Sequence, residues 1–514
     1  MAVRALQFSI VNPMKRTGPH QRPRIATTPK GNVMSKETFR AEAKFTLLGE
    51  EGCDRITDAV CEVLENTGCL MKNAEARTLL EKAGCTVDGE HVRIPKQVVL
   101  DAVNSAPKAD ELVIYDRNGK PAITFEDGDC LFGPAITTVF IIDPGTGEKR
   151  RGTRKDAERT AVLLDGLENF AWVSTLASIN DGDAALTDIY EVQALVKNTE
   201  KPIMYWSSRL ENLEAQHEMF YAVAGGKEAY QERPFAIDLV CPLDPLVHPD
   251  DGLEQLIFLA QNNSPAVYIA GAGMGSTCPI TIAGCLTIGL ADTLAGLVVS
   301  QLANPGAPFI ASKFSDNIDM RTVSAYFSSP EWVTANMLTA EVFRRLNLPF
   351  CLNYGASSSG HLDQIAAFDI AAQYQAALLS DSSMNFAAGA VENGNVADYA
   401  ALVFANDIIG YLKTLFSPVE ISDETLLLQS IDEVGPGGNF LAEDETLENF
   451  GDMWAPEALK PLGFDKWMEN GGKDTVETLR AYALDVIAEG SKHPLDAEKA
   501  RAVDDIVTQA ESGK

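Results

Sequence analysis

The sequence lacks the motifs that commonly mark metal and nucleophile sites. Its 514 residues include only six histidines, far apart and without HExxH or HxxEH spacing, so no metal site is expected. No GxSxG elbow occurs, which argues against a Ser/His/Asp hydrolase. Nine scattered cysteines form no CxxC pair. A disulfide framework is therefore not expected, and a reducing, cytoplasmic location is.

Positive charge is also scarce. The chain has 42 Lys and Arg against 73 Asp and Glu, for a formal charge of -31. Nucleic acids and anionic membranes reward cationic surfaces, so neither partner is expected. The most hydrophobic stretch, residues 280–302, is interrupted by glycines and carries Asp292. It predicts a buried helix and not a membrane span.

The N-terminus has the opposite bias, because residues 1–36 contain no Asp or Glu but seven Lys and Arg. Several prolines and the lack of an apolar core segment argue against a secretory signal. We interpret residues 1–38 as a disordered basic extension, with Met34 as a candidate natural start and a transit segment as the alternative.

The folded body divides into two regions. Residues 39–150 show helical spacing and then short β runs, which predicts a helical N-terminal layer and a small β-rich insertion packed on the next region. In residues 151–514, seven strand-like runs alternate with helical segments, and an eighth strand is expected before residue 150. The predicted fold is an α/β TIM (β/α)8 barrel with C-terminal helices, because no GxGxxG turn with an acidic ribose partner supports an open nucleotide-binding sheet.

In a TIM barrel the functional residues follow the strands. The stretch "YGASSSGHLDQ", residues 354–364, combines small residues with a histidine. Aromatic side chains occupy similar positions, and they either fill the core or form a cage for a cationic ligand. These aromatic residues are Tyr205, Trp206, Phe314, Tyr354 and Phe368.

Residues 241–312, from "CPLDPLVHPDDGL" to "QLANPGAPFIAS", resemble the central segment of the trimethylamine methyltransferase family. Similar stretches occur upstream, at residues 88–107 and 141–156, and downstream, at residues 435–456. The resemblance extends from about residue 45 to the C-terminus. It implies a TIM barrel that transfers a methyl group from a methylated amine to the Co(I) corrinoid of a separate corrinoid protein.

Founding members of that family carry pyrrolysine in a loop with a pattern like G-x-x-x-S-K-x-P-D-x-Q. Gly355, Ser359 and Asp363 match this pattern, but Gly360 replaces its basic residue, and no nonstandard residue appears. The chain thus resembles a branch without pyrrolysine. A quaternary amine suits this branch, since its leaving group is a neutral tertiary amine and no proton need move. Glycine betaine, proline betaine, carnitine and γ-butyrobetaine are the expected candidates.

On this hypothesis each candidate residue has an expected role. His361 and Asp363 are assigned to the catalytic loop. The expected substrate-binding residues are Tyr354, Phe368, Trp206, Tyr205, Lys313 and Phe314, with Lys313, Arg209 or loop N–H groups after Gly271 as partners of the substrate carboxylate. The residues expected to face the corrinoid are Gly355, Ser358, Ser359, Gly360, Gly273 and Gly275.

Two other functions stay open at this point. One is a non-catalytic barrel that senses or binds methylated amines. The other is a lyase or aldolase that uses Lys313, at the end of the strand-like run "PFIASKF", to form a Schiff base. A homo-oligomer is expected, although the sequence does not indicate its symmetry.

Overall fold

The structure is a computed structural model, and it describes residues 45–126, 128–319, 321 and 324–513. The predicted basic extension, residues 1–38, lies outside these residues. The main sheet is parallel throughout its barrel portion. Its strands, in spatial order, are β6 (Leu131–Pro134), β16 (Met384–Ala388), β15 (Phe350–Asn353), β13 (Phe309–Asp319), β12 (Ala266–Met274), β10 (Ala236–Val240) and β9 (Ile203–Tyr205).

Residues 171–174 close this sheet into a ring. Val173 pairs in parallel with Ile203 of β9. On the other side, the Ala171 N–H donates to the carbonyl of Phe132 in β6 over 2.9 Å. Counting this segment, eight strand positions surround the axis, and each is followed by an outer helix. The predicted TIM (β/α)8 barrel is confirmed.

The first barrel strand, β6, comes from "LFGP", a stretch that reads like a turn. Gly133 is required there, because a Cβ atom on it would lie 1.9 Å from a ring carbon of the buried Trp172. The sequence of this strand reflects the close approach of Trp172 to Gly133 and shows no apolar alternation. The barrel therefore begins before residue 151.

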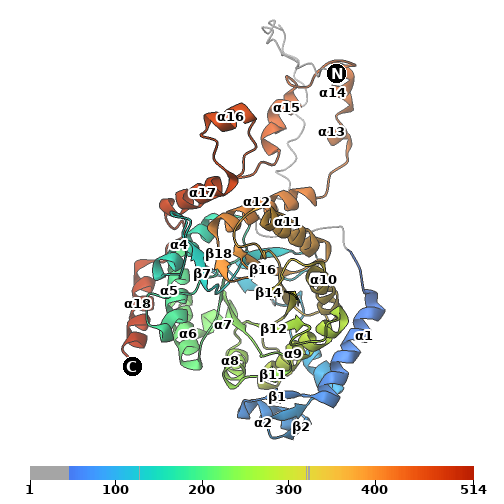
Figure 1. Cartoon of the computed structure of the whole chain (residues 1–514), viewed down its shortest axis with the longest axis vertical. Coiled ribbons are helices and arrows are strands. Elements are labelled where there is room, and N and C mark those ends of the chain that lie inside the picture. Colours follow the sequence, from blue (N-terminus) through green and yellow to red (C-terminus); the bar gives the residue numbers. More distant parts are fainter. Residues whose placement is uncertain (1–44, 127, 320, 322–323, 514) are drawn as a thin grey trace.

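The outer helices form a ring around the strands (Figure 1). In chain order they are α4 (Arg154–Gly166), α5 (Thr187–Asn198), α6 (Leu210–Ala224), α8 (Asp250–Gln261), α9 (Ile282–Ala303), α10 (Pro330–Arg345), α11 (Gln364–Leu379) and α12 (Tyr399–Leu415). Several begin at a side-chain cap, such as Thr153 before α4 and Ser329 before α10. The additional short helix α7 (Lys227–Glu232) follows α6.

Helix α9 is the predicted buried helix. It is the one helix in the described ranges long and apolar enough to cross a membrane, and 72% of that apolar window is buried inside the protein. It packs against β12 and β13 on one side and against α8, α1 and α3 on others. Gly296 lets Tyr268 of β12 approach, because a Cβ atom there would lie 2.4 Å from the ring. Its hydrophobicity is explained by these contacts.

The N-terminal layer packs on this helix. Its helices are α1 (Gly49–Glu62), α2 (Ala74–Lys82) and α3 (Lys96–Ser105), with a π-helical turn at Val63–Thr67. Its strands are β1 (Cys69–Met71), β2 (Thr86–Asp88) and β3 (His91–Arg93), and β1 pairs in parallel with β11 (Val247–His248), which lies between β10 and α8 in the chain. The layer is thus attached to the barrel through a shared sheet.

Short strands make up the β-rich part. A hairpin joins β4 (Ile114–Tyr115) and β5 (Pro121–Ile123). A second sheet contains β17 (Ala390–Val391), β18 (Val396–Ala397), β7 (Phe140–Ile142) and β8 (Lys149–Arg150). This sheet joins the insertion to the loop after β16, beyond the carboxyl end of a barrel strand.

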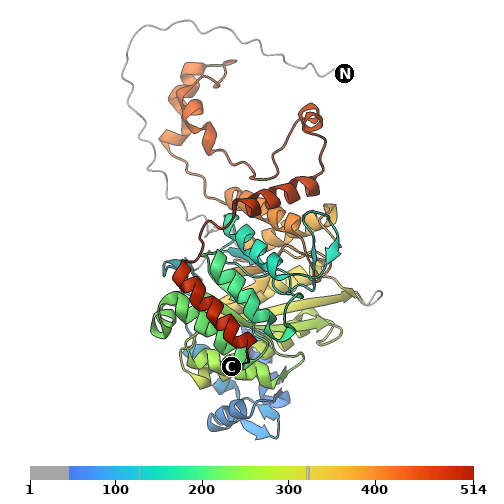
Figure 2. The same ribbon diagram turned by 90° about the vertical axis from the view of Figure 1, so that its left-hand side faces the viewer.

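The C-terminal segment has two parts. Helices α17 (Thr475–Glu489) and α18 (Ala497–Glu511) pack on the barrel helices, α17 on α12 and α4, and α18 on α5 and α6 (Figure 2). The preceding residues form an arm that leaves the barrel beyond α12 (Figure 1). Its short helices are α13 (Asp423–Leu426), α14 (Leu428–Val434), α15 (Asp444–Asn449), a 3-10 turn at Phe450–Asp452 and α16 (Phe464–Glu469).

Candidate active site at the barrel mouth

All barrel strands are parallel, so their carboxyl ends open at one face, the mouth. Strands β12 and β13 continue beyond their neighbours, and their pairing extends to Met274 and Asn317. Figure 2 shows these long strands reaching past the rest of the barrel. The short strand β14 (Ser324–Ala325) pairs with the end of β13. This extension forms one wall of the mouth.

Phe314 of β13 faces the barrel interior. Its neighbour Lys313 is directed outward, because the Lys313 Nζ lies 3.4 Å from the Cys285 Sγ of α9 and a Cβ atom on Gly289 would lie 2.7 Å from the lysine chain. Side chains alternate along a strand, so Phe314 is directed to the opposite side. Its half-buried ring contacts that of Phe327 edge to face, with centroids 5.2 Å apart.

This geometry places Lys313 in the layer between β13 and α9, fully buried. A lysine there is not directed into the mouth, where a substrate would form a Schiff base or present its carboxylate. Arg209 is exposed and donates from Nε to the Asn212 Oδ1 over 3.0 Å. Lys313 does act on the carboxyl group of Asp244: burial raises the pKa of that group, and the lysine charge lowers it.

A carboxylate does lie beside Phe314. Asp244 follows β10, and its Oδ2 is 3.2 Å from the point where a Cβ atom on Gly271 would lie; the same point is 3.7 Å from the ring of Phe314. Gly271 pairs with Phe314 across β12 and β13, so both face the interior. The missing side chain of Gly271 leaves the carboxylate next to an aromatic face, an arrangement that suits a cationic ligand.

Asp244 belongs to a buried carboxyl pair with Asp292 of α9. Burial raises the pKa of Asp244, and burial together with the nearby Asp244 charge raises the pKa of Asp292 further. The two carboxyl groups are hydrogen bonded, and Asp292 Oδ2 also accepts from the Leu246 N–H over 3.1 Å. Two carboxylates this close favour retaining one proton between them. We place that proton on Asp292, which leaves the negative charge on Asp244.

A histidine supports the far side of this pair. The His248 Nε2 lies 3.5 Å from Asp292 Oδ1, and its Nδ1 lies 2.7 Å from the hydroxyl of Tyr268. Burial lowers the pKa of His248 to about 3, so the ring is neutral near pH 7. It therefore orients Asp292 without cancelling the charge of Asp244.

Trp206 marks the mouth near β9. It is half-buried, and its indole N–H donates to Glu191 Oε2 of α5 over 2.8 Å. The same oxygen accepts from the Thr175 hydroxyl over 2.7 Å. Burial raises the pKa of Glu191 to about 7, although these hydrogen bonds act in the opposite direction. Trp206 is thus held by a carboxyl group that titrates near neutrality.

The stability of the protein should consequently fall as the pH rises from 5 to 8. In this range folded Glu191 keeps a proton that the unfolded chain has released, so the free energy of unfolding decreases with pH, by about 2 kcal/mol for this group. Denaturant titrations across this range should show a flatter dependence in Glu191→Gln. Trp206→Phe removes a hydrogen-bond donor that stabilises the charged form of Glu191, so the pKa of Glu191 should rise. The decrease in the free energy of unfolding should then extend to higher pH. An unchanged slope in Glu191→Gln would contradict the assignment.

The serine loop, residues 354–363, is held by its own hydrogen bonds. The Ser357 hydroxyl donates to Asp369 Oδ2 over 2.7 Å, and Ser358 Oγ accepts from the Phe327 N–H over 3.1 Å. The Ser359 hydroxyl donates to Asp363, whose other oxygen caps α11 by accepting from the Ala366 N–H. Asp363 therefore has a structural contact, and Ser358 connects the loop to the Phe314–Phe327 pair.

The two glycines of this loop differ. Gly355 has φ of +109°, and a Cβ atom there would lie 2.5 Å from the buried hydroxyl of Tyr374. A Cβ atom on Gly360 would meet nothing within 4 Å. Gly355 is thus required by packing, whereas Gly360 is surrounded by open space. The turn after β12 is also closed by its own bonds, since the N–H groups of Gly273 and Gly275 donate to Thr277 and Cys278.

The other predicted aromatic residues lie away from the interior. Tyr205 is buried against Phe220, with its hydroxyl 3.2 Å from the His217 Nε2 of α6. Tyr354 is buried against Trp332 of α10. Phe368 is 70% exposed on α11. Of the proposed cage residues, Trp206 and Phe314 are the two that lie partly exposed at the carboxyl ends of strands.

His361 is exposed on the rim, next to Gly360. Replacing it with Ala should change the affinity for the methyl donor less than about threefold, because a substitution at an exposed surface position usually has a small effect. Isothermal titration calorimetry of the full chain measures this directly. A tenfold or larger loss of affinity would instead place the imidazole in contact with the donor.

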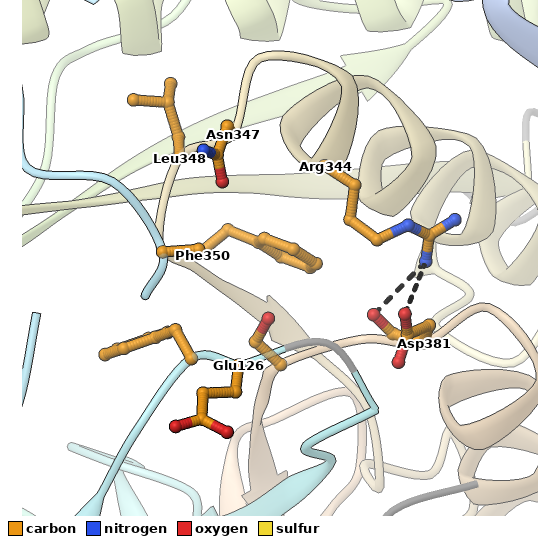
Figure 3. Close-up of a pocket in the computed structure, with 9 residues that line it drawn as sticks. Glu126, Arg344, Asn347, Leu348, Phe350 and Asp381 are labelled. Atoms are coloured by element: carbon orange, nitrogen blue, oxygen red, sulfur yellow. Dashed lines mark hydrogen bonds and ion pairs between the residues drawn. The ribbon is translucent and has the colours of Figure 1, made fainter. Parts of the chain in front are cut away.

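Figure 3 shows a pocket at the opposite end of the barrel, beside the start of β15. Its volume of about 20 Å³ has room for about one water molecule. Arg344 closes it by donating to the carbonyls of Ser380 and Asp381. In TIM barrels this end serves stability, so the pocket is not the active site.

In the sequence, Asp244 is one of several carboxylates that follow strand-like runs, and no pattern gives a functional role to it, to Asp292, to His248 or to Phe327. Two signals pointed to the first pair: an aspartate directly after the run "FAIDLVCPL", and an aspartate inside the apolar segment 280–302. Charged residues in such settings are rarely fully buried without a partner. No group of three metal-ligating side chains occurs in the described part of the chain.

The chain is a (β/α)8 barrel with a candidate site at the carboxyl ends of its strands. The chain belongs to the trimethylamine methyltransferase family, whose model matches residues 15–513. It is accordingly a methyltransferase. The family expected from the sequence is confirmed.

Two relatives illustrate the range of the family. The trimethylamine methyltransferase MttB of Desulfitobacterium hafniense (strain DSM 10664 / DCB-2) is 28% identical over 474 residues, which cover 91% of this chain and 95% of the relative. The glycine betaine methyltransferase of Desulfitobacterium hafniense (strain Y51) is 26% identical over 446 residues, covering 86% and 91%. Among solved structures, the monomethylamine methyltransferase MtmB of Methanosarcina barkeri matches with a TM-score of 0.48 and 11% identity, covering 92% and 90%.

Proposed function

We propose that this enzyme transfers a methyl group from a quaternary amine, such as glycine betaine or a related betaine, to the Co(I) corrinoid of a separate protein. One observation carries the proposal: the Asp244 carboxylate and the ring of Phe314 both approach the point where a Cβ atom on Gly271 would lie, at 3.2 and 3.7 Å. A carboxylate with an aromatic surface favours a permanent cation bearing methyl groups. Methylated amines are also what the names of the relatives specify.

A quaternary amine needs only residues that position the substrate and exclude water from it. The partner's corrinoid would supply a two-electron nucleophile to a methyl carbon. The carbon–nitrogen bond then breaks with its electron pair going to nitrogen, and the leaving tertiary amine is neutral. No proton is needed, so no general acid is required in the mouth.

Different residues of this chain would bind the cation, cover its methyl groups and hold the shared proton. Asp244 would hold the positive charge near Phe314, and the Phe314–Phe327 pair would cover the methyl groups and exclude water. Asp292 would retain the shared proton and so keep the charge on Asp244. A reaction without pyrrolysine is proposed because the serine loop has Gly360, which carries no side chain, where the family pattern has a lysine.

The test is a methyl-transfer assay with purified protein and free cob(I)alamin, followed by the loss of the cob(I)alamin absorbance. Glycine betaine, proline betaine, carnitine and γ-butyrobetaine are the donors, and trimethylamine is the comparison. Transfer from at least one quaternary amine and not from trimethylamine is expected. Transfer from trimethylamine alone would overturn the substrate class. Calorimetric binding of a quaternary amine with no transfer, including with a corrinoid protein as acceptor, would favour a sensor.

A further inference from the structure

The arm, residues 417–473, displays a large apolar surface. It carries 15 of the 26 large hydrophobic side chains that are exposed in the described residues, although it is only 57 residues long. These 15 are Val419, Ile421, Leu426, Leu428, Ile431, Phe440, Leu441, Leu447, Phe450, Met453, Trp454, Leu462, Phe464, Trp467 and Met468. Figures 1 and 2 both show the arm standing away from the barrel.

The arm is held in place at its base. The Asp407 carboxylate of α12 accepts from the N–H groups of Glu457, Ala458 and Leu459 over 2.9–3.1 Å. The ring of Trp454 contacts that of Tyr411 on α12, with centroids 5.5 Å apart. Residues 454–459 at the base of the arm are therefore attached to the barrel helix α12.

The exposed surface continues from the arm onto α12. Tyr411 and Leu415 are 47% and 51% exposed, and their spacing of four residues places them on one helix face. Because Tyr411 also contacts Trp454, this face adjoins the base of the arm. The arm and the α12 face therefore adjoin at Trp454 and Tyr411.

The size of this surface indicates what covers it. Fifteen side chains that each lose on the order of 100 Å² give more than about 1,000 Å² per chain, which is the range of stable and obligate interfaces. A monomer seldom exposes so many large apolar side chains within one segment. A methyl acceptor that must dissociate in every cycle would leave it uncovered for much of the time. A second copy of the chain is present whenever the chain is, and it can cover the surface permanently.

We propose that two copies of this chain form an obligate dimer in which the arm and the α12 face of each copy cover those of the other. A two-fold axis would place the same surface on both sides of the contact. Each arm carries 13 Asp and Glu against three Lys, a net charge of -10. The dimer would therefore be held by apolar contacts against like-charge repulsion, which makes its salt dependence informative.

The experiment compares the full chain with an arm variant, Leu441→Ser, Phe450→Ser and Met453→Ser, by analytical ultracentrifugation and light scattering at micromolar concentration. The three residues are 70–79% exposed, so the variant should keep the melting temperature of its barrel. Wild type should contain at least two copies, and the variant should dissociate at least about 100-fold more readily. Ile280→Ser, which removes a side chain 63% exposed elsewhere, is the control and should stay dimeric.

Salt separates the proposed partner from others. Raising NaCl from 50 to 500 mM should strengthen the dimer, because the two acidic arms repel less when screened. An assembly that salt dissociates would identify a basic partner segment on the acidic arm, and would overturn the proposal. A wild-type chain that is monomeric at 10 μM, or a dimer that survives in the arm variant, would overturn it as well.

Discussion

Asp244→Asn should raise the KM for the quaternary amine by about 10–100-fold. The substitution removes the negative charge beside Phe314, and a charged group that contacts an oppositely charged ligand in a half-buried site contributes roughly 1.5–3 kcal/mol. If Asp244 only positions the cation, kcat should fall much less than kcat/KM. The measurement is steady-state methyl transfer at several donor concentrations, with the melting temperature recorded for each variant.

Two further variants control this result. Asp292→Asn imitates the protonated partner and leaves Asp244 charged, so transfer should stay within about threefold of wild type. Glu392→Gln removes a carboxylate that pairs with the Lys149 Nζ over 2.7 Å. The backbone N–H of Glu392, which the substitution keeps, donates to the carbonyl of Ser359 in the serine loop. The substitution should leave KM unchanged, because the charge of this carboxylate is already paired with Lys149. An equal rise of KM in Glu392→Gln would indicate a general charge effect, and an unchanged KM in Asp244→Asn would remove Asp244 from the site.

Gly355→Ala should destabilise the barrel by roughly 3 kcal/mol, whereas Gly360→Ala should change stability by less than about 0.5 kcal/mol. The first substitution forces an L side chain into φ of +109° and places its Cβ 2.5 Å from the Tyr374 hydroxyl. The second adds a methyl group to open space in the same loop. Urea unfolding of the two variants under identical conditions measures the difference.

Tyr374→Phe provides the matched control. It removes the hydroxyl that Gly355 approaches, so Gly355→Ala in that background should cost less than in wild type, although the strain from positive φ remains. If Gly355→Ala lowers the free energy of unfolding as little as Gly360→Ala does, then packing does not require the small residue at position 355 of the serine loop. The loop would then be free to serve the corrinoid, as the sequence first suggested.

Much of the fold could be predicted because local patterns carry it. Helical spacing and apolar strand runs repeat through residues 151–415, and consecutive β/α units can close into a barrel only if they are parallel and equally covered. The apolar segment 280–302 was identified as a buried helix from its glycines and Asp292. The strand β6 was not identified, because its residues are selected by contact between Gly133 and Trp172, which are 39 positions apart.

The candidate site could likewise be predicted only in part from the sequence. The sequence by itself determined the family and the presence of aromatic residues after the strands, because these are properties of adjacent residues. Only the tertiary structure decided which side chains share the mouth. Alternation along β13 directs Phe314 inward and Lys313 toward α9, and chain folding brings Asp244, Gly271 and Asp292 together from three separate segments. Such proximity depends on register and packing, which no local pattern encodes.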